Sequence, residues 1–218
     1  MKLLPADHRT LALTLVELLV VMATLALIGL FILPQLTRQH HKSSRIGCIN
    51  NLKQVGLSYR LWADDNFDKY PMRLSVTNGG AMEPVASGIV FPAFRVMSNE
   101  MSTPKIVVCP EDSQRSVATN FTTDFNNTKV SYFVGLDADL SKSSMLLSGD
   151  HNLTTNGTAI TTRLATLTTS SITGWTAQIH KHKGNIGLAD GSVQQVTATG
   201  LQKLIANTGV ATNRLALP

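Results

Sequence analysis

The chain has few charged residues and few aromatic ones. Over 218 residues, Asp, Glu, Lys and Arg together make 15% and Phe, Trp and Tyr make 6%. The formal net charge is +5, but the basic residues are scattered along the chain. A protein that binds nucleic acid usually gathers Lys and Arg in a patch with interleaved aromatic side chains. Because no such patch is visible, we expect no nucleic-acid partner.

Short motifs that mark catalysis are also missing. The sequence holds no Gly-x-Ser-x-Gly, no Gly-rich phosphate-binding loop and no His-Glu-x-x-His. These motifs fix a nucleophile, a phosphate cradle or a general base at a set spacing. We therefore predict that the chain is not an enzyme and that it has no cofactor.

Only two cysteines are present, Cys48 and Cys109, and neither lies in a Cys-x-x-Cys or Cys-x-x-His sequence. This spacing argues against a redox motif and against a zinc motif. In an oxidising compartment a disulfide between them would close a loop of about 60 residues, stabilising the fold by on the order of 4 kcal/mol. Two buried free thiols are the alternative.

A long apolar run near the N-terminus is the main feature that is present. Residues 11–33 carry one charge, Glu17. At ~1.5 Å per residue, a helix of this length spans the ~30 Å hydrocarbon core of a bilayer, so the run predicts a transmembrane segment. A secretory signal peptide is the alternative, but its apolar core has only ~7–15 residues. An acidic residue within a membrane segment costs ~2.5–3.5 kcal/mol, so Glu17 must have a specific role.

The stretch Ala12-Leu13-Thr14-Leu15-Val16-Glu17 resembles the N-terminal signal of type IV pilins and type II secretion pseudopilins. The resemblance implies a leader at residues 1–12, which a prepilin peptidase removes by cutting between Ala12 and Leu13. It also implies N-methylation of Leu13 and a part in filament assembly for Glu17 and for Pro34, where such helices usually kink. Ala12 stands where Gly is usual, and Leu13 where Phe is usual.

Three further segments resemble a large pseudopilin-like family of exported bacterial proteins. They are the run from Cys48 to Gly56 (Cys-x-Asn-Asn-Leu-Lys-Gln-x-Gly), Cys109-Pro110, and His180 with Asp190-Gly191 in a His-x9-Asp-Gly signature. We interpret the signature as a structural hairpin element. The alternative is a metal site of His180 and His182 with Asp190, or with Asp150-His151, in which a strand would turn both imidazoles to one face.

The remaining sequence predicts one helix followed by short strands. Apolar residues recur every three or four positions from Ile46 to Trp62, which indicates an amphipathic helix that Asp64–Asp68 and Pro71 end. Strands are predicted at 105–109, 129–134, 145–148, 185–189 and 192–196, the last two joined by a type I′ turn at Asp190-Gly191. The Thr-rich segment 154–173 is predicted to be mainly loop, and a short helix is predicted after Thr199.

These observations predict an α+β fold of pilin-like kind. A long N-terminal helix, its first half transmembrane, packs against a small antiparallel sheet. The predicted segments are a leader (1–12), a transmembrane or filament-core half-helix (13–34), an amphipathic half-helix (35–70) and a β-rich periplasmic domain (71–218).

The resemblance also implies the function, the partners and the location. It implies a structural subunit of a type II secretion pseudopilus or of a type IV pilus-like filament, and both remain open. Its partners would be other filament subunits, the prepilin peptidase, an inner-membrane assembly platform and, before assembly, membrane lipid. The subunit would sit in the bacterial inner membrane as a single-pass protein before it joins the filament. A membrane-anchored periplasmic metal-binding or enzymatic module that uses His180, His182 and Asp190 is the alternative.

Calcium is a further candidate ligand, because major pseudopilins often hold this ion in a loop. Two acidic clusters carry the oxygen ligands that calcium prefers: Asp64, Asp65 and Asp68, and Asp137 with Asp139. Neither has the spacing of an EF-hand loop. Solvated loops are therefore the preferred interpretation of both.

Overall fold

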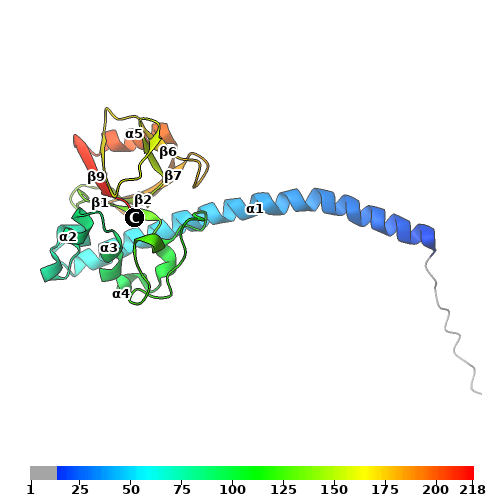
Figure 1. The fold of residues 1–218 in the computed structure, drawn as a ribbon, viewed down its shortest axis with the longest axis horizontal. Coiled ribbons are helices and arrows are strands. Elements are labelled where there is room, and N and C mark those ends of the chain that lie inside the picture. Colours follow the sequence, from blue (N-terminus) through cyan, green and yellow to red (C-terminus); the bar gives the residue numbers. More distant parts are fainter. Residues whose placement is uncertain (1–13) are drawn as a thin grey trace, which may run out of the picture. The chain divides into compact units, whose positions relative to one another are not determined.

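The structure, a computed structural model, describes residues 14–218, without the side chains of residues 31–43. It divides into two parts, Met1–Lys42 and Ser43–Pro218, which are described separately below. Helix α1 (Leu15–Asp64) contributes its first residues to one part and its last to the other. All strands belong to the second part (Figure 1).

After α1 the second part begins with short helices and continues with strands. The helices are η1 (Pro71–Arg73), η2 (Val76–Asn78), α2 (Met82–Ala86), α3 (Phe91–Val96), α4 (Ser98–Met101), η3 (Pro104–Val107), η4 (Asn127–Lys129) and, near the end, α5 (Ala198–Asn207). The strands are β1 (Tyr132–Gly135), β2 (Leu146–Asp150), β3 (Leu153–Thr155), β4 (Thr158–Ala159), β5 (Leu164–Thr168), β6 (Thr173–Trp175), β7 (Gly184–Leu188), β8 (Val193–Val196) and β9 (Thr212–Ala216).

The strands form two antiparallel sheets. The larger has six strands in the order β5-β9-β1-β2-β7-β8, and the smaller has three in the order β4-β3-β6. At the centre of the larger sheet, Val134 pairs with Ser148 of β2 on one side and with Ala216 of β9 on the other. The last strand of the chain thus lies inside the sheet, which ties the C-terminal segment to the centre of the domain.

Successive residues of the central strands enter two different cores. Tyr132 and Val134 pack in the first core with the buried side of α1, whereas Phe133 packs in the second core with α5. This follows from the two-residue period of a strand, which points neighbouring side chains to opposite faces. Within this part, α2, α3, α4 and the end of α1 lie on one side of the sheet and α5 lies on the other (Figure 1).

The buried stripe on the second half of α1 agrees with the sequence pattern. Leu52, Val55, Tyr59 and Trp62 are all buried in the first core, at the three- and four-residue spacing that keeps side chains on one helix face. The pattern fails at its start, because Ile46 is 51% exposed. Cys48 takes the corresponding place in the core.

Thr14 and Glu17 cap the N-terminus of α1 by hydrogen-bonding to each other. The backbone N–H and hydroxyl of Thr14 donate to Glu17 Oε2 at 2.8 and 2.9 Å, and the Glu17 N–H donates to the Thr14 hydroxyl at 3.3 Å. This is the capping-box arrangement, which satisfies helix N–H groups that have no partner within the helix. These bonds, first that from the Thr14 backbone, lower the pKa of the Glu17 carboxyl below its usual value.

No helix in the part of the chain that the structure describes is long and apolar enough to cross a membrane. The predicted transmembrane first half, and the single-pass inner-membrane location that depended on it, are therefore wrong.

The predicted fold class needs correction in a second respect. The α+β class and the antiparallel pairing are right, but in place of one small sheet the chain forms a six-stranded and a three-stranded sheet. The predicted pilin-like architecture, a long helix with a transmembrane first half packed on one small sheet, is therefore wrong. Most of the extra strands come from the Thr-rich segment, where β3 to β6 replace the predicted loop.

Two local predictions also fail. Residues 105–109, predicted as a strand, begin in the 3₁₀ helix η3, because Pro104 starts a turn that the Thr103 hydroxyl caps. The Asp190-Gly191 connection is a three-residue loop instead of a type I′ turn. Gly191 has a φ of 83° whereas Asp190 does not have a positive φ, and Gly191 N–H donates to Leu188 O. A type I′ turn needs both central residues at positive φ.

Candidate functional site

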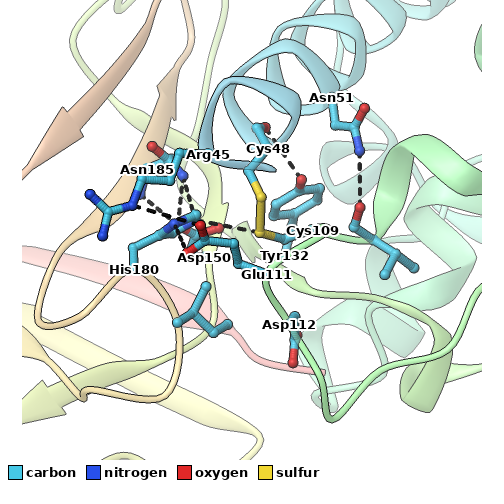
Figure 2. Close-up of a disulfide and its surroundings, with 12 residues drawn as sticks. Arg45, Cys48, Asn51, Cys109, Glu111, Asp112, Tyr132, Asp150, His180 and Asn185 are labelled. Atoms are coloured by element: carbon cyan, nitrogen blue, oxygen red, sulfur yellow. Dashed lines mark hydrogen bonds and ion pairs between the residues drawn. A yellow bond between two sulfur atoms is a disulfide. The ribbon is translucent and has the colours of Figure 1, made fainter. Parts of the chain in front are cut away.

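The two cysteines join helix α1 to the domain. Cys48 on α1 and Cys109, just after η3, form a disulfide with their Cα atoms 4.8 Å apart. Both are buried. The neighbouring Asn51 side chain donates to Val108 O at 2.9 Å. A covalent and a hydrogen-bonded link therefore connect adjacent turns of α1 to the segment that follows η3 (Figure 2).

His180 reaches the disulfide from an unusual left-handed turn. His180, Lys181 and His182 have φ values of 56°, 50° and 62°, a region that costs residues other than glycine ~1–2 kcal/mol each. The Asn152 side chain holds the turn by donating to Thr176 O and Ile179 O, both at 3.1 Å. The strand predicted here, with His180 and His182 on one face, is therefore absent.

His180 lies at the centre of a buried polar cluster (Figure 2). Its Nδ1 is 3.1 Å from Glu111 Oε2. On the other side, its Nε2 is 3.4 Å from Cys109 Sγ, 2.9 Å from Asn185 Nδ2 and 3.4 Å from Asp150 Oδ2. Asp150 and Asn185 are fully buried, and His180 is 2% exposed. The cluster is thus buried around Asp150 and Asn185, and Glu111 is its partly exposed edge.

The hydrogen-bond network fixes the tautomer of His180. The Asn185 amide nitrogen can only donate, and it lies between His180 Nε2 and Asp150 Oδ2. We therefore assign Nε2 as an acceptor and Nδ1–H as the donor to Glu111. The lone pair on Nε2 then accepts from the Asn185 amide, beside the disulfide and Asp150.

Burial shifts the pKa values of Asp150 and His180 in the directions that favour their neutral forms. The pKa of Asp150 rises to about 7, because burial disfavours the carboxylate more than the two hydrogen bonds from Asn185 favour it. Burial likewise lowers the pKa of His180, against the opposing effect of Glu111. Removing a charged group from water without full compensation accounts for both directions.

Asp190, at the other end of the His-x9-Asp-Gly signature, binds the β7–β8 loop and helix α1. Asp190 Oδ1 accepts from Ser192 N–H at 2.8 Å and closes the β7–β8 loop, while Asp190 O accepts from Arg60 of α1 at 2.8 Å. Tyr70 donates to Ala189 O at 2.8 Å. The signature therefore binds the helix region twice, at the disulfide through His180 and at Arg60 through the loop.

The metal site predicted as an alternative is not assembled as predicted. Among described residues, the group close enough to share an ion is Cys48, Cys109 and His180. His182 Nδ1 lies 3.2 Å from Trp175 O, and Asp190 serves the hairpin loop.

The two acidic clusters proposed for calcium have different surroundings. Asp137 pairs with Arg214, and Asp139 pairs with Arg73 at 3.8 Å and accepts from Ser141. Asp64, Asp65 and Asp68 lie at the exposed end of α1 and in the turn that follows it.

The proposed processing and assembly residues are only partly described. Ala12 and Leu13 lie outside the described residues, whereas Glu17 lies in the first turn of α1 and the helix continues through Pro34.

Sequence reasoning missed Glu111 and Asn185. Glu111 follows the Cys109-Pro110 pair, and Asn185 lies in a predicted strand. Nothing in the local pattern signals that both face His180.

Comparison of the chain with models of protein families, with curated proteins and with solved structures finds no match.

The arrangement can serve as a latch. The cluster links α1, the segment after η3 and β7 through one histidine. Its hydrogen bonds and its disulfide join elements that are far apart in the sequence.

Proposed function

We propose that this chain is a structural subunit of a filament of the type II secretion pseudopilus or type IV pilus kind, processed by a prepilin peptidase. One observation carries the proposal. The first turns of α1 expose a continuous apolar surface with a single acidic residue at its start. The signal-like sequence at residues 12–17 adds the expectation of cleavage after Ala12.

The exposed apolar surface needs a partner. Leu15 is 75% exposed and Leu30 is 74% exposed, and most large apolar side chains between them are exposed as well. Contiguous apolar patches of this kind mark interaction surfaces. Copies of the same helix, packed side by side, would bury this surface and drive assembly through the hydrophobic effect.

Glu17 would set the stagger of the packed helices. Cleavage after Ala12 leaves Leu13 with a free α-amine, which a neighbouring subunit's Glu17 would meet as the apolar helices come together. A desolvated ion pair of this kind is better suited to fix register than to add net stability. The Thr14 cap keeps the Glu17 carboxylate at the helix start before assembly.

The latch at Cys48 supports the same function. A filament built from helices must carry its outer domains without letting them slip along those helices. The disulfide, the Asn51 bond to Val108 O and the Arg60 bond to Asp190 O hold the second half of α1 to the domain. These three contacts span about three helical turns, so they fix the helix against both rotation and sliding.

Two variants separate the charge of Glu17 from its capping role. Glu17→Gln keeps an acceptor for the Thr14 cap, since Gln also fits a capping box, and it removes the charge. Thr14→Val removes the hydroxyl and keeps the charge. We expect Glu17→Gln to abolish filaments seen by electron microscopy in the source cells, with the subunit still processed and folded, and Thr14→Val to assemble.

The opposite pattern would contradict the proposal. Filaments formed by Glu17→Gln but lost in Thr14→Val would make Glu17 a helix cap only. An absence of filaments from cells that make and process the unaltered chain would remove the assembly function altogether.

A further inference from the structure

We propose that reduction of the Cys48–Cys109 disulfide turns the cluster around His180 into a zinc site. Its four ligands are the two cysteine sulfurs, His180 Nε2 and a carboxylate oxygen of Asp150. The inference goes beyond filament assembly and does not depend on it. It rests on the geometry of the ligand atoms, the orientation of His180 and an uncompensated oxygen of Asp150.

Three of the four ligands already lie close together, and the fourth lies next to His180. Zinc binds sulfur at ~2.3 Å and nitrogen or oxygen at ~2.0–2.2 Å, so two tetrahedral ligands lie about 3.4–3.6 Å apart when one is nitrogen. His180 Nε2 is 3.4 Å from Cys109 Sγ and 3.4 Å from Asp150 Oδ2. The ligand atoms of Cys48, Cys109 and His180 all lie within 4.8 Å of one another. To close the site, the two bonded sulfurs must separate to about 3.8 Å, and the Asp150 carboxylate, which lies outside this group of three, must approach them.

His180 is oriented as zinc-binding histidines are. Such a histidine almost always donates its other ring N–H to a carboxylate or carbonyl, which fixes the tautomer and raises the basicity of the ligating nitrogen. Here Nδ1 faces Glu111 Oε2 at 3.1 Å. Nε2 lies 3.4 Å from both Cys109 Sγ and Asp150 Oδ2, and zinc would take the place of the Asn185 amide hydrogen bond at this nitrogen.

Asp150 supplies an independent sign of a missing cation. Its carboxyl is fully buried, and its Oδ1 atom has no hydrogen-bond partner among the described residues. A buried carboxylate oxygen without a partner is costly. A zinc ion next to Asp150 would compensate the charge, and the Asn185 N–H and amide bonds to Oδ2 would hold the carboxylate in place.

The conversion balances with a dithiol as reductant. The dithiol transfers two electrons and two protons to the disulfide, becomes a disulfide itself and leaves Cys48 and Cys109 as thiols. Zinc then displaces one proton from each thiol, because thiolate is the form that binds metal. The oxidised chain lacks both thiolates and should therefore not bind zinc at this place.

The test compares the oxidised and the reduced full chain. Each form is incubated with zinc and, in a separate sample, with cobalt(II), whose visible spectrum reports its ligands. A sample with the dithiol or phosphine reductant and no added metal is the control. We expect one tightly held zinc per reduced chain and none on the oxidised chain. Cobalt should give the intense visible bands of a tetrahedral thiolate site in the reduced chain only.

Matched variants assign the ligands. His180→Ala and Asp150→Asn should weaken zinc binding by at least 10-fold in the reduced chain, and Glu111→Gln should weaken it by about 10- to 100-fold, the usual range for a residue that orients a ligand. His182→Ala should leave binding unchanged. Circular dichroism on each variant separates loss of ligand from loss of fold.

Three outcomes would overturn the proposal. They are a folded reduced chain that binds no zinc, binding that is equal in His180→Ala, and a reduced chain that unfolds and is not refolded by zinc. In the last case a bound ion would have stabilised the native state by mass action, so its failure to do so excludes the site.

Discussion

At the scale of single residues, His180 explains the spacing of the His-x9-Asp-Gly signature. The histidine contacts the disulfide from a left-handed turn, and five residues later Asn185 returns in β7 to bind both His180 and Asp150. The Asp-Gly pair then closes the loop after β7. The spacing is therefore that of a turn, a strand and a loop, which together carry one contact to the disulfide and one to α1.

The raised pKa of Asp150 predicts that the stability of the fold depends on pH. Its pKa is about 7 in the oxidised folded chain against an ordinary 3.8, so between pH 4 and 7 the folded state binds more protons than the unfolded state. The free energy of unfolding should then fall as the pH rises through this window. At about 1.4 kcal/mol per pKa unit, the full effect is on the order of 4 kcal/mol.

Denaturant unfolding of the oxidised chain at several pH values measures this dependence. Asp150→Asn should be the more stable of the two chains above pH 7, with a flatter profile, because the amide is neutral throughout. A wild-type profile that rises between pH 4 and 7 relative to Asp150→Asn would show that the Asp150 carboxyl is not held neutral.

The positive φ of Gly191 predicts that replacing this glycine destabilises the domain through backbone strain. Its φ of 83° is strongly disfavoured for a β-branched residue, so Gly191→Val should destabilise the domain by about 1–3 kcal/mol. Asn tolerates this region better, so Gly191→Asn should cost less. Thermal unfolding of both variants tests the order, and equal losses would point to contact with Arg60 instead of backbone strain.

At the scale of elements, the second half of α1 is the part of the domain that local sequence determines best. The spacing of Leu52, Val55 and Tyr59 is enough to identify the buried face, and Asp-Gly between two apolar runs is enough to place the β7–β8 hairpin. Helices α2, α3 and α4 have six residues or fewer, too few for a periodic pattern to emerge.

Long-range contacts account for the elements that sequence patterns could not reveal. The His180–His182 turn is left-handed because Asn152, far away in sequence, binds the carbonyl groups that precede it. The sequence does not reveal the assembled cluster for the same reason, since Asp150 and Asn185 meet only when β2 and β7 pair, and Glu111 comes from the distant segment after η3. Patterns of periodicity report neighbours along the chain and not partners across a sheet.

The disulfide predicts how strongly α1 is tied to the domain. The cysteines are 61 positions apart, and closing a loop of that length stabilises the folded state by about 4 kcal/mol in the chain-entropy model. The double variant Cys48→Ser with Cys109→Ser should therefore lose about that much in denaturant unfolding without zinc. Wild type in excess reductant is the matched control, and a loss below about 1 kcal/mol would show that the hydrogen bonds alone hold the helix.

At the scale of the whole molecule, the chain combines two parts with different tasks. The first turns of α1 offer an apolar surface with a capped acidic residue, and residues 43–218 form a domain latched to the end of the same helix. The apolar run from Leu11 to Leu33 predicted a membrane span, whereas no helix among the described residues is long and apolar enough for one. The sequence pattern understated the second part, where nine strands form two sheets.

The most direct measurement is the intact mass of the protein isolated from its source cells. The central claim requires cleavage between Ala12 and Leu13, since only a new α-amine at Leu13 can pair with Glu17 of a neighbour. We predict a chain that begins at Leu13 and carries one additional methyl group on its terminal amine. A mass that corresponds to a chain beginning at Met1, or to a cut beyond Ala23, would contradict the account.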